Sequence, residues 1–421
     1  MSMSSTDPAH IFVHIGTMKT GTSYLQQVLE RNTDTLARDG AIYANGGPGT
    51  HRAIQDALSL EEGATDGAWS RMAKVSREHP GSRVIISNEL LSFADDERAQ
   101  RIVASFAPNP VTVIITARDL VRLLPSAWQN KVKHGRGWPF DRYVDSVIGD
   151  GGPKGAARSF WHHHDLGTIV RRWVAAAGAD QVVVIPVPGR DAGPDALWER
   201  FASVTGLSSS GYDLRQDRRS NLSLGYAETE LLRHVNRRLH DQTDWHRQKK
   251  VIQRLLANEV LRPDPSRPAS NERPILTPAQ HAWAAAKSRD LAEEVAATGV
   301  RVHGELDELV PPPLTEAEER AALTAAPPDT PEMFVDVVAA LVVRLVETAR
   351  GDEPAEDSPD DDQAEWDEHD DHPEPAQRTN RRGRGSGGQR RAGRAGRVAA
   401  SPSLDERIDP DLAEELDDFE L

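Results

Sequence analysis

Near the amino terminus, a lysine and several hydroxyl residues stand beside two glycines, in an order that suits the binding of an anion. The segment reads GTMKTGTS over residues 16–23, after a β-branched apolar run and before a helical pattern of leucine and valine. Glycine allows sharp turns, and the free N–H groups at the start of a helix bind anions. The lysine adds a mobile positive charge, and the hydroxyls add donors. We therefore predict an anion-binding loop built from Gly16, Lys19, Thr20, Gly21, Thr22 and Ser23.

The position of the lysine separates this loop from the common nucleoside-triphosphate loop. That loop follows the pattern G-x-x-x-x-G-K-[ST], with its lysine directly after the second glycine. Here Lys19 comes two residues before Gly21. A kinase or nucleotide hydrolase, which would depend on Mg²⁺, is therefore a less favoured alternative.

A second segment, residues 112–131, combines an apolar β-branched run with an arginine at its end and a helical pattern beyond it. Arg118 stands at the end of the predicted strand, and Ser126 follows after seven intervening residues. In a doubly wound sheet, ligands collect at the carboxyl ends of the strands. An arginine there can donate two parallel hydrogen bonds to a phosphate, and a serine two helical turns further on can donate to the same group.

Together the two segments resemble those of sulfotransferases that use 3′-phosphoadenosine 5′-phosphosulfate (PAPS), in particular bacterial members with the P-loop sulfotransferase fold. The resemblance covers roughly residues 10 to 240 and lies in G-x-x-K-[ST]-G-[ST]-[ST] and in the R-x7-S interval. It implies that the loop around Lys19 holds the 5′-phosphosulfate and that Arg118 and Ser126 hold the 3′-phosphate. It also implies a basic segment that closes over the 3′-phosphate, to which we assign Arg219.

The resemblance further implies a base that takes the proton of the acceptor hydroxyl, either a histidine or a glutamate. Glu89 follows the apolar run at residues 83–87 and is our candidate, with Lys19 as the second catalytic residue. His51, at the start of a predicted helix, is the alternative base. A glutamate that caps the following helix would be the purely structural interpretation of Glu89. Sulfuryl carries less charge than a terminal phosphate, so no metal is expected to be required.

The elements that must position these residues alternate between strand and helix. Apolar runs at residues 11–15, 83–87, 112–117 and 181–185, the last of which we predict to be the final core strand, are separated by helical patterns. This alternation predicts an α/β fold with a parallel sheet flanked by helices.

The remaining chain divides by composition. We expect a disordered start at residues 1–9, a sulfotransferase-like domain at 10–240, a helical extension packed on the core at 241–350 and a disordered tail at 351–421. The tail holds 22 acidic residues and nine arginines, a net charge of −13 out of −16 for the chain, and cannot bury enough apolar surface to fold alone. It is most simply a soluble polyampholyte, although its end could fold on a protein partner.

Composition also excludes several functions. The chain has no cysteine, so disulfides and thiol catalysis are excluded. No secretory signal or transmembrane run is visible, which predicts a cytoplasmic protein. The part before the tail is almost neutral, without a clear nucleic-acid site. The three histidines at 162–164 cannot all face one ion on a helix, so we favour a structural or acceptor-facing role for them over a metal site.

The sequence leaves the acceptor open. A small-molecule hydroxyl, carried for example by a carbohydrate or a lipid, fits the resemblance. A non-catalytic member of the fold, which binds an anion or a partner without turnover, is the second alternative.

Overall fold

The computed structural model describes seven stretches of the chain and a few positions between 334 and 345. The stretches are residues 7–45, 49–59, 67–149, 151–152, 155–215, 224–239 and 273–331. Arg219 and the predicted tail at 351–421 lie outside the described residues.

A six-stranded parallel sheet forms the centre of the fold, in the order β2-β3-β1-β4-β5-β6. The strands are β1 His10–His14, β2 Ala41–Tyr43, β3 Arg83–Ser87, β4 Val111–Ala117, β5 Val182–Pro186 and β6 Arg301–Val302. The predicted α/β class with a parallel sheet is confirmed. The last fully buried strand is β5, close to the predicted residues 181–185, and the two-residue edge strand β6, which is not buried and was not predicted, pairs with it. A strand of two residues is too short to leave an alternating pattern in the sequence.

Helices cover both faces of the sheet and extend past one end of it. Their bounds are α1 Thr22–Arg31, α2 Thr33–Arg38, α3 Thr50–Leu58, α4 Ala68–Arg77, α5 Asp96–Ala104, α6 Leu120–Lys133, α7 Phe140–Ile148, α8 Ala156–His164, α9 Leu166–Ala177, α10 Ala196–Thr205, α11 Tyr226–Leu239, α13 Pro278–Ala297 and α14 Glu316–Thr324. Short 3₁₀ turns add η1 Glu89–Phe93, η2 Ala179–Gln181, η3 Arg190–Ala192 and η5 Leu306–Leu309.

The alternation of side chains along each strand builds two separate cores. On β1, Ile11 and Val13 face a cluster with α3, α4, α5 and α9, whereas Phe12 faces a cluster with α1 and α10. Successive strand residues point to opposite faces, so a run that is apolar throughout belongs to a strand covered on both sides. The central strands β1 and β4 are buried on both faces in this way.

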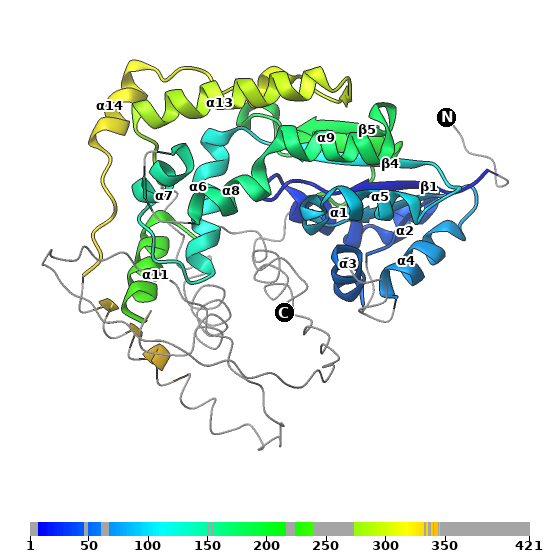
Figure 1. Cartoon of the computed structure of the whole chain (residues 1–421), viewed down its shortest axis with the longest axis horizontal. Helices are drawn as coiled ribbons and strands as arrows, with labels where there is room; N and C mark the ends of the chain where they lie inside the picture. Colours follow the sequence, from blue (N-terminus) through cyan, green and yellow to red (C-terminus); the bar gives the residue numbers. More distant parts are fainter. Residues whose placement is uncertain are drawn as a thin grey trace, which may run out of the picture.

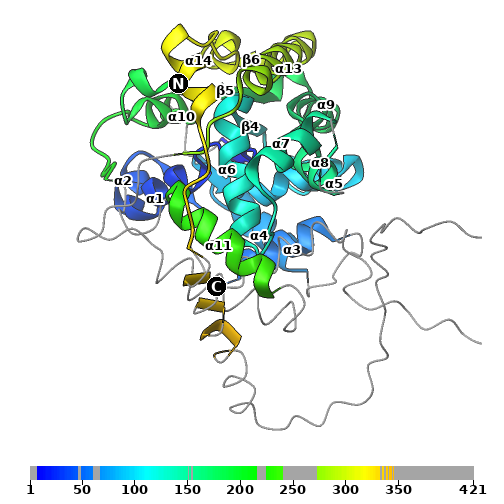
Figure 2. The same cartoon turned by 90° about the vertical axis from the view of Figure 1, so that its left-hand side faces the viewer.

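A third cluster lies beyond the carboxyl ends of the strands. It joins α6, α7, α8, α11 and α13 around the fully buried Trp128, and Figure 1 shows α6, α7, α8 and α11 side by side past the end of the sheet. Figure 2, turned by 90°, shows α6, α7 and α8 near β4, with α11 below them. The helix α13 packs against both α6 and α9. Helices therefore cover the carboxyl edge of the sheet.

The strand order creates a switch point between β1 and β4. The chain runs from β1 to one side of it, through β2 and β3, and then continues on the other side with β4 and β5. Adjacent loops leave in opposite directions at such a point, which opens a crevice for ligands. The predicted anion loop follows β1 and Arg118 follows β4, so both segments border this crevice. No helix in the described part of the chain is long and apolar enough to cross a membrane.

Candidate active site

The loop after β1 is held by the neighbouring strand β4. The N–H groups of Ile15 and Thr17 donate to the backbone oxygens of Ile114 and Thr116, at 2.9 and 3.0 Å. Between them Gly16 adopts a φ of +58°, in the region that side chains other than glycine rarely occupy. The loop thus leaves the sheet at a point defined by backbone pairing.

Gly16 also needs to be glycine because space is lacking. A Cβ added there would lie 2.6 Å from the hydroxyl oxygen of Thr22 at the start of α1. The hydrogen on Gly16 lets the first turn of α1 approach the end of β1. The loop is therefore compact, and its N–H groups are concentrated around a small volume.

Replacing Gly16 with alanine should destabilise the protein by more than the same change at Gly67. Gly67 has a similar φ of +66° but open space around its missing Cβ, so it reports the cost of backbone strain alone. The clash with Thr22 adds to that cost, and we expect an extra loss of at least about 1 kcal/mol of unfolding free energy. Denaturant titrations of both variants measure the difference. Equal losses would show that the space at Gly16 is not needed.

The amino end of α1 is open to a ligand. Gly21 is its N-cap, no side chain caps the helix, and no acidic residue stands in its first turn. The Thr22 hydroxyl is buried and has no hydrogen-bond partner in the described structure, while Ser23 is exposed. Uncapped N–H groups with an unsatisfied hydroxyl beside them suit an anion, because a bound oxyanion would accept from all of them.

Lys19 lies in this loop in an unusual conformation. Its φ is +65°, a positive value for a residue that is not glycine. Such backbone costs energy and often marks a functional position. The Arg118 guanidinium donates from Nη1 to the backbone oxygen of Lys19 at 3.2 Å. The structure thus brings together the two cationic residues that the sequence analysis singled out 99 positions apart.

Thr20 faces into the protein. Its side chain is fully buried, and its hydroxyl donates to the backbone oxygen of Thr17 and lies 2.7 Å from the Thr116 hydroxyl. The hydroxyl of Thr20 is therefore committed to holding the loop on β4. Its backbone N–H is the group that it can offer to a ligand.

Glu89 begins the η1 turn directly after β3. Asn88 caps this turn by accepting from the Leu90 N–H at 3.0 Å, so Glu89 does not cap it. The Glu89 side chain is only 8% exposed, and Gln26 donates to its Oε2 at 3.1 Å. Burial raises the pKa of Glu89, and the positive charge of Lys19 opposes part of that rise. A carboxylate with a raised pKa beside a lysine is suited to accept a proton.

Two further predicted site residues, His51 and Ser126, lie on the helices α3 and α6. His51 is in the first turn of α3, and α3 packs against η1, which carries Glu89. Ser126 lies on α6, where its hydroxyl donates to the backbone oxygen of Arg122 at 3.3 Å. Arg219 lies outside the described residues.

His163 and His164 lie at the end of α8, and His164 lines a small cavity together with Thr17 of the anion loop. Both are buried, and burial lowers the pKa of His164 to about 3, helped by the charges of Lys131 and Lys19. The rings of His163 and His164 stand at 89° to each other, and His163 packs on Phe93 of η1. No group of three metal-ligating side chains occurs among the residues that the structure describes. His164 is not among the predicted site residues, because three adjacent histidines in a sequence carry no signal for which of them points inward.

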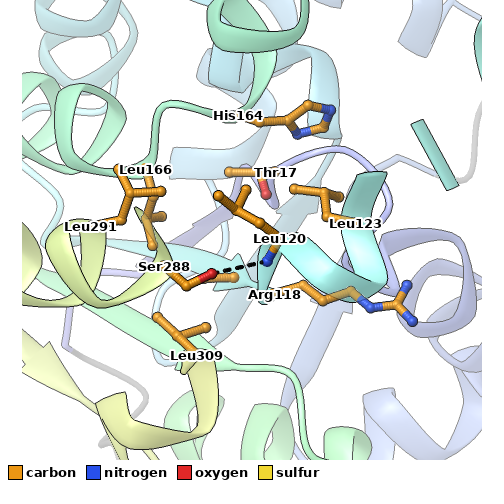
Figure 3. A pocket seen from close by; sticks show the side chains of 10 residues that line it. Thr17, Arg118, Leu120, Leu123, His164, Leu166, Ser288, Leu291 and Leu309 are labelled. Atoms are coloured by element: carbon orange, nitrogen blue, oxygen red, sulfur yellow. Dashed lines mark hydrogen bonds between the residues drawn. The ribbon is translucent and has the colours of Figure 1, made fainter. Parts of the chain in front are cut away.

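Figure 3 shows a small cavity between His164, Thr17 and the start of Arg118, with the Arg118 guanidinium extending away from it. Its volume of about 10 Å³ has room for a single water molecule. Leucines of α6, α9 and α13 form most of the remaining wall, and Ser288 of α13 accepts from the Leu120 N–H at 3.1 Å. The helix α13 therefore braces the start of α6, just after Arg118.

Comparisons with known proteins give limited information. No protein-family model and no curated protein matches the chain. The crystal structure of a sulfotransferase from Alicyclobacillus acidocaldarius is similar over 49% of this chain and 85% of that chain, with 17% identity and a TM-score of 0.35. The functional proposal therefore depends on the residues and geometry of the site.

Proposed function

We propose that this chain is a sulfotransferase that moves a sulfuryl group from PAPS to the hydroxyl group of an acceptor. The observation that carries the proposal is the hydrogen bond from Arg118 to the backbone of Lys19. A nucleotide with a phosphosulfate at its 5′ position and a phosphate at its 3′ position needs two cationic groups near each other. Arg118, whose guanidinium reaches the backbone oxygen of Lys19, and the Lys19 side chain would supply them beyond the carboxyl ends of the adjacent strands β4 and β1.

The residues present fit such a donor. The uncapped start of α1, with the unsatisfied Thr22 hydroxyl, Ser23 and the Thr20 N–H, would hold the 5′-phosphosulfate. Arg118, with Ser126 on α6, would hold the 3′-phosphate. Arg219, which lies outside the described residues, is the further 3′-phosphate ligand that the resemblance implies. A charged fork and a hydroxyl are the groups that recognise a phosphate ester in proteins.

The proposed chemistry is an in-line transfer. The acceptor oxygen forms a bond to sulfur while the bond from sulfur to the phosphate oxygen breaks, and adenosine 3′,5′-bisphosphate leaves. Glu89 takes the proton of the acceptor hydroxyl. Lys19 stabilises the negative charge that develops on the leaving oxygen. Positioning and charge supply most of the catalysis in transfers of this type, so the proposed reaction uses no metal.

Binding experiments test the donor assignment. We expect adenosine 3′,5′-bisphosphate to bind in the presence of EDTA, and more tightly than ATP with Mg²⁺. A preference for ATP with Mg²⁺ would support the alternative kinase. Binding of the bisphosphate without sulfate transfer to any hydroxyl acceptor would favour the non-catalytic alternative. Turnover is measured by mass spectrometry of acceptor mixtures, including glycans and lipids, incubated with PAPS.

Replacing Arg118 with alanine should weaken binding of adenosine 3′,5′-bisphosphate by about 10- to 100-fold, because charged hydrogen bonds to the 3′-phosphate are lost. Binding of adenosine 5′-monophosphate, which lacks that phosphate, should weaken by a smaller factor, because only the hydrogen bond from Arg118 to the Lys19 backbone is lost. Calorimetry of both nucleotides measures the two effects. Arg171, which is exposed and pairs with Glu294, is the control position. An equal loss for both nucleotides would contradict recognition of the 3′-phosphate by Arg118.

A further inference from the structure

A buried histidine at the end of β1 has no part in the proposed chemistry but lies directly beneath the site. His14 is fully buried in the central strand. Its Nδ1 lies 2.8 Å from the hydroxyl of Ser87 on β3, and its Nε2 lies 3.2 Å from the hydroxyl of Thr116 on β4. The imidazole thus bridges the strands on both sides of β1. A polar ring in such a position needs both contacts, because a buried group without a partner is costly.

His14 belongs to a series of linked hydrogen bonds that ends with the contact of the Thr20 hydroxyl to the backbone oxygen of Thr17. The donor in each of these bonds can be assigned by starting from that contact. The backbone oxygen of Thr17 can only accept, so the Thr20 hydroxyl donates its single proton there. The Thr116 hydroxyl must then donate to Thr20, across 2.7 Å. Thr116 therefore has no proton left for His14, and Nε2 of His14 must carry the proton that it donates to Thr116.

Whether Nδ1 of His14 carries a proton follows from the charge of the ring. Burial lowers the pKa of His14 to about 3, so the ring is neutral and carries one proton. With that proton on Nε2, Nδ1 accepts from the Ser87 hydroxyl. The chain of donors thus runs in one direction from Ser87 through His14, Thr116 and Thr20 to Thr17. Bonds aligned in this way strengthen one another.

Each end of the chain reaches a different part of the candidate site. At one end, Thr20 and Thr17 belong to the anion loop. At the other end, the backbone oxygen of Ser87 accepts at 3.0 Å from Gln26, the same amide that donates to Glu89. His14 therefore lies between the anion loop and Gln26, the residue whose amide donates to the proposed base Glu89.

We infer that His14 is a positioning residue that holds the anion loop in its binding conformation, as the Nε2–H tautomer, through Thr116 and Thr20. The inference deepens the proposed function and depends on it only for the nucleotide used as a probe. Without the chain, Thr20 is released from β4, and the neighbouring Lys19 loses the backbone conformation that directs its charge. Anion affinity then falls although no residue that contacts the ligand has changed.

The protein contains a matched control for this inference. His10, at the other end of β1, places Nε2 2.8 Å from the hydroxyl of Thr112 on β4. Like His14 and Thr116, this pair joins a histidine of β1 to a threonine of β4 that lies 102 positions further along the sequence. The His10 pair lies at the amino end of the sheet, away from the loop. Loss of its hydrogen bond costs stability without changing the site.

The variants Thr116→Val and Thr112→Val test the inference in the full chain. We expect Thr116→Val to bind adenosine 3′,5′-bisphosphate about tenfold more weakly than the wild type. Thr112→Val should bind within about twofold of the wild type, whatever its loss in Tm. Thr116→Ser, which keeps the hydroxyl, should restore affinity. Equal affinities of the two valine variants would overturn the inference.

A ligand-free measurement separates this inference from the proposed function. The ¹⁵N chemical shifts of His14 report its tautomer, and we expect Nε2 protonated and Nδ1 bare. Amide exchange of Thr17 should accelerate in Thr116→Val but not in Thr112→Val. If the wild type fails to bind the bisphosphate, the proposed function is wrong, and the tautomer and exchange results still decide the inference. A proton on Nδ1, or unchanged exchange at Thr17, would overturn it.

Discussion

Replacing Lys19 with methionine should lower kcat for sulfate transfer by about 10²- to 10³-fold, the size of effect seen when a charge-stabilising group is lost from an active site. Methionine keeps much of the length of the side chain and removes its charge. Because the proposed role of Lys19 is to stabilise charge that develops on the leaving oxygen, kcat should fall more than the affinity for PAPS. Steady-state kinetics with PAPS and calorimetry with adenosine 3′,5′-bisphosphate measure the two quantities.

Lys74→Met is a suitable control for this experiment. Lys74 is an exposed residue in the last turn of α4, outside the carboxyl edge of the sheet. Its loss removes the same charge from the protein and should leave kcat unchanged. Turnover of Lys19→Met close to that of the wild type would remove Lys19 from the mechanism. A loss confined to nucleotide affinity would make it a binding residue only.

Replacing Glu89 with glutamine should lower kcat by about 10²- to 10⁴-fold, because the proposed base can no longer accept a proton. In the wild type, kcat/KM should fall as the pH drops through the raised pKa of Glu89, since only the carboxylate acts as a base. A pH profile measures this acid limb, and residual activity of the variant should lack it. Nearly full activity of Glu89→Gln would transfer the role of base to His51.

The same substitution should stabilise the protein at neutral pH. Burial raises the pKa of Glu89 in the folded state above its unfolded value, so the folded protein binds the proton more tightly. The stability linked to this proton is fully present below the unfolded pKa and is lost as the pH rises through the folded pKa. Glutamine cannot ionise and avoids that loss. Denaturant titrations at pH 5 and pH 8 should therefore show a larger advantage of Glu89→Gln at pH 8.

An exposed glutamate controls for this stability effect. Glu97→Gln, in the first turn of α5, changes a residue in contact with water. It should show no comparable advantage at pH 8. If Glu89→Gln were no more stable than the wild type at pH 8, burial would not raise the pKa of Glu89 in the folded protein.

The alternation of apolar runs and helical patterns was sufficient to predict the parallel sheet, because strands covered on both faces are apolar throughout. Short edge strands escaped the prediction, since the two residues of β6 leave no pattern. The positions of Lys19 and Arg118 at the ends of β1 and β4 were also readable, because a residue that follows a buried strand must emerge at its carboxyl edge. Their assigned roles stay predictions until the variants are measured.

The spacing of glycine, lysine and hydroxyl residues in one short segment determined that an anion loop should follow the first strand, since such chemistry is local. Only the tertiary structure decided which hydroxyls face a ligand and which face the core. Thr20 and Thr22 look alike in the sequence, yet Thr20 is bound to Thr116 and Thr22 has no partner in the described structure. The reason is physical: a hydroxyl becomes a donor to a ligand or a brace for the loop according to the strand packed beside it. That strand lies about a hundred residues away in the chain.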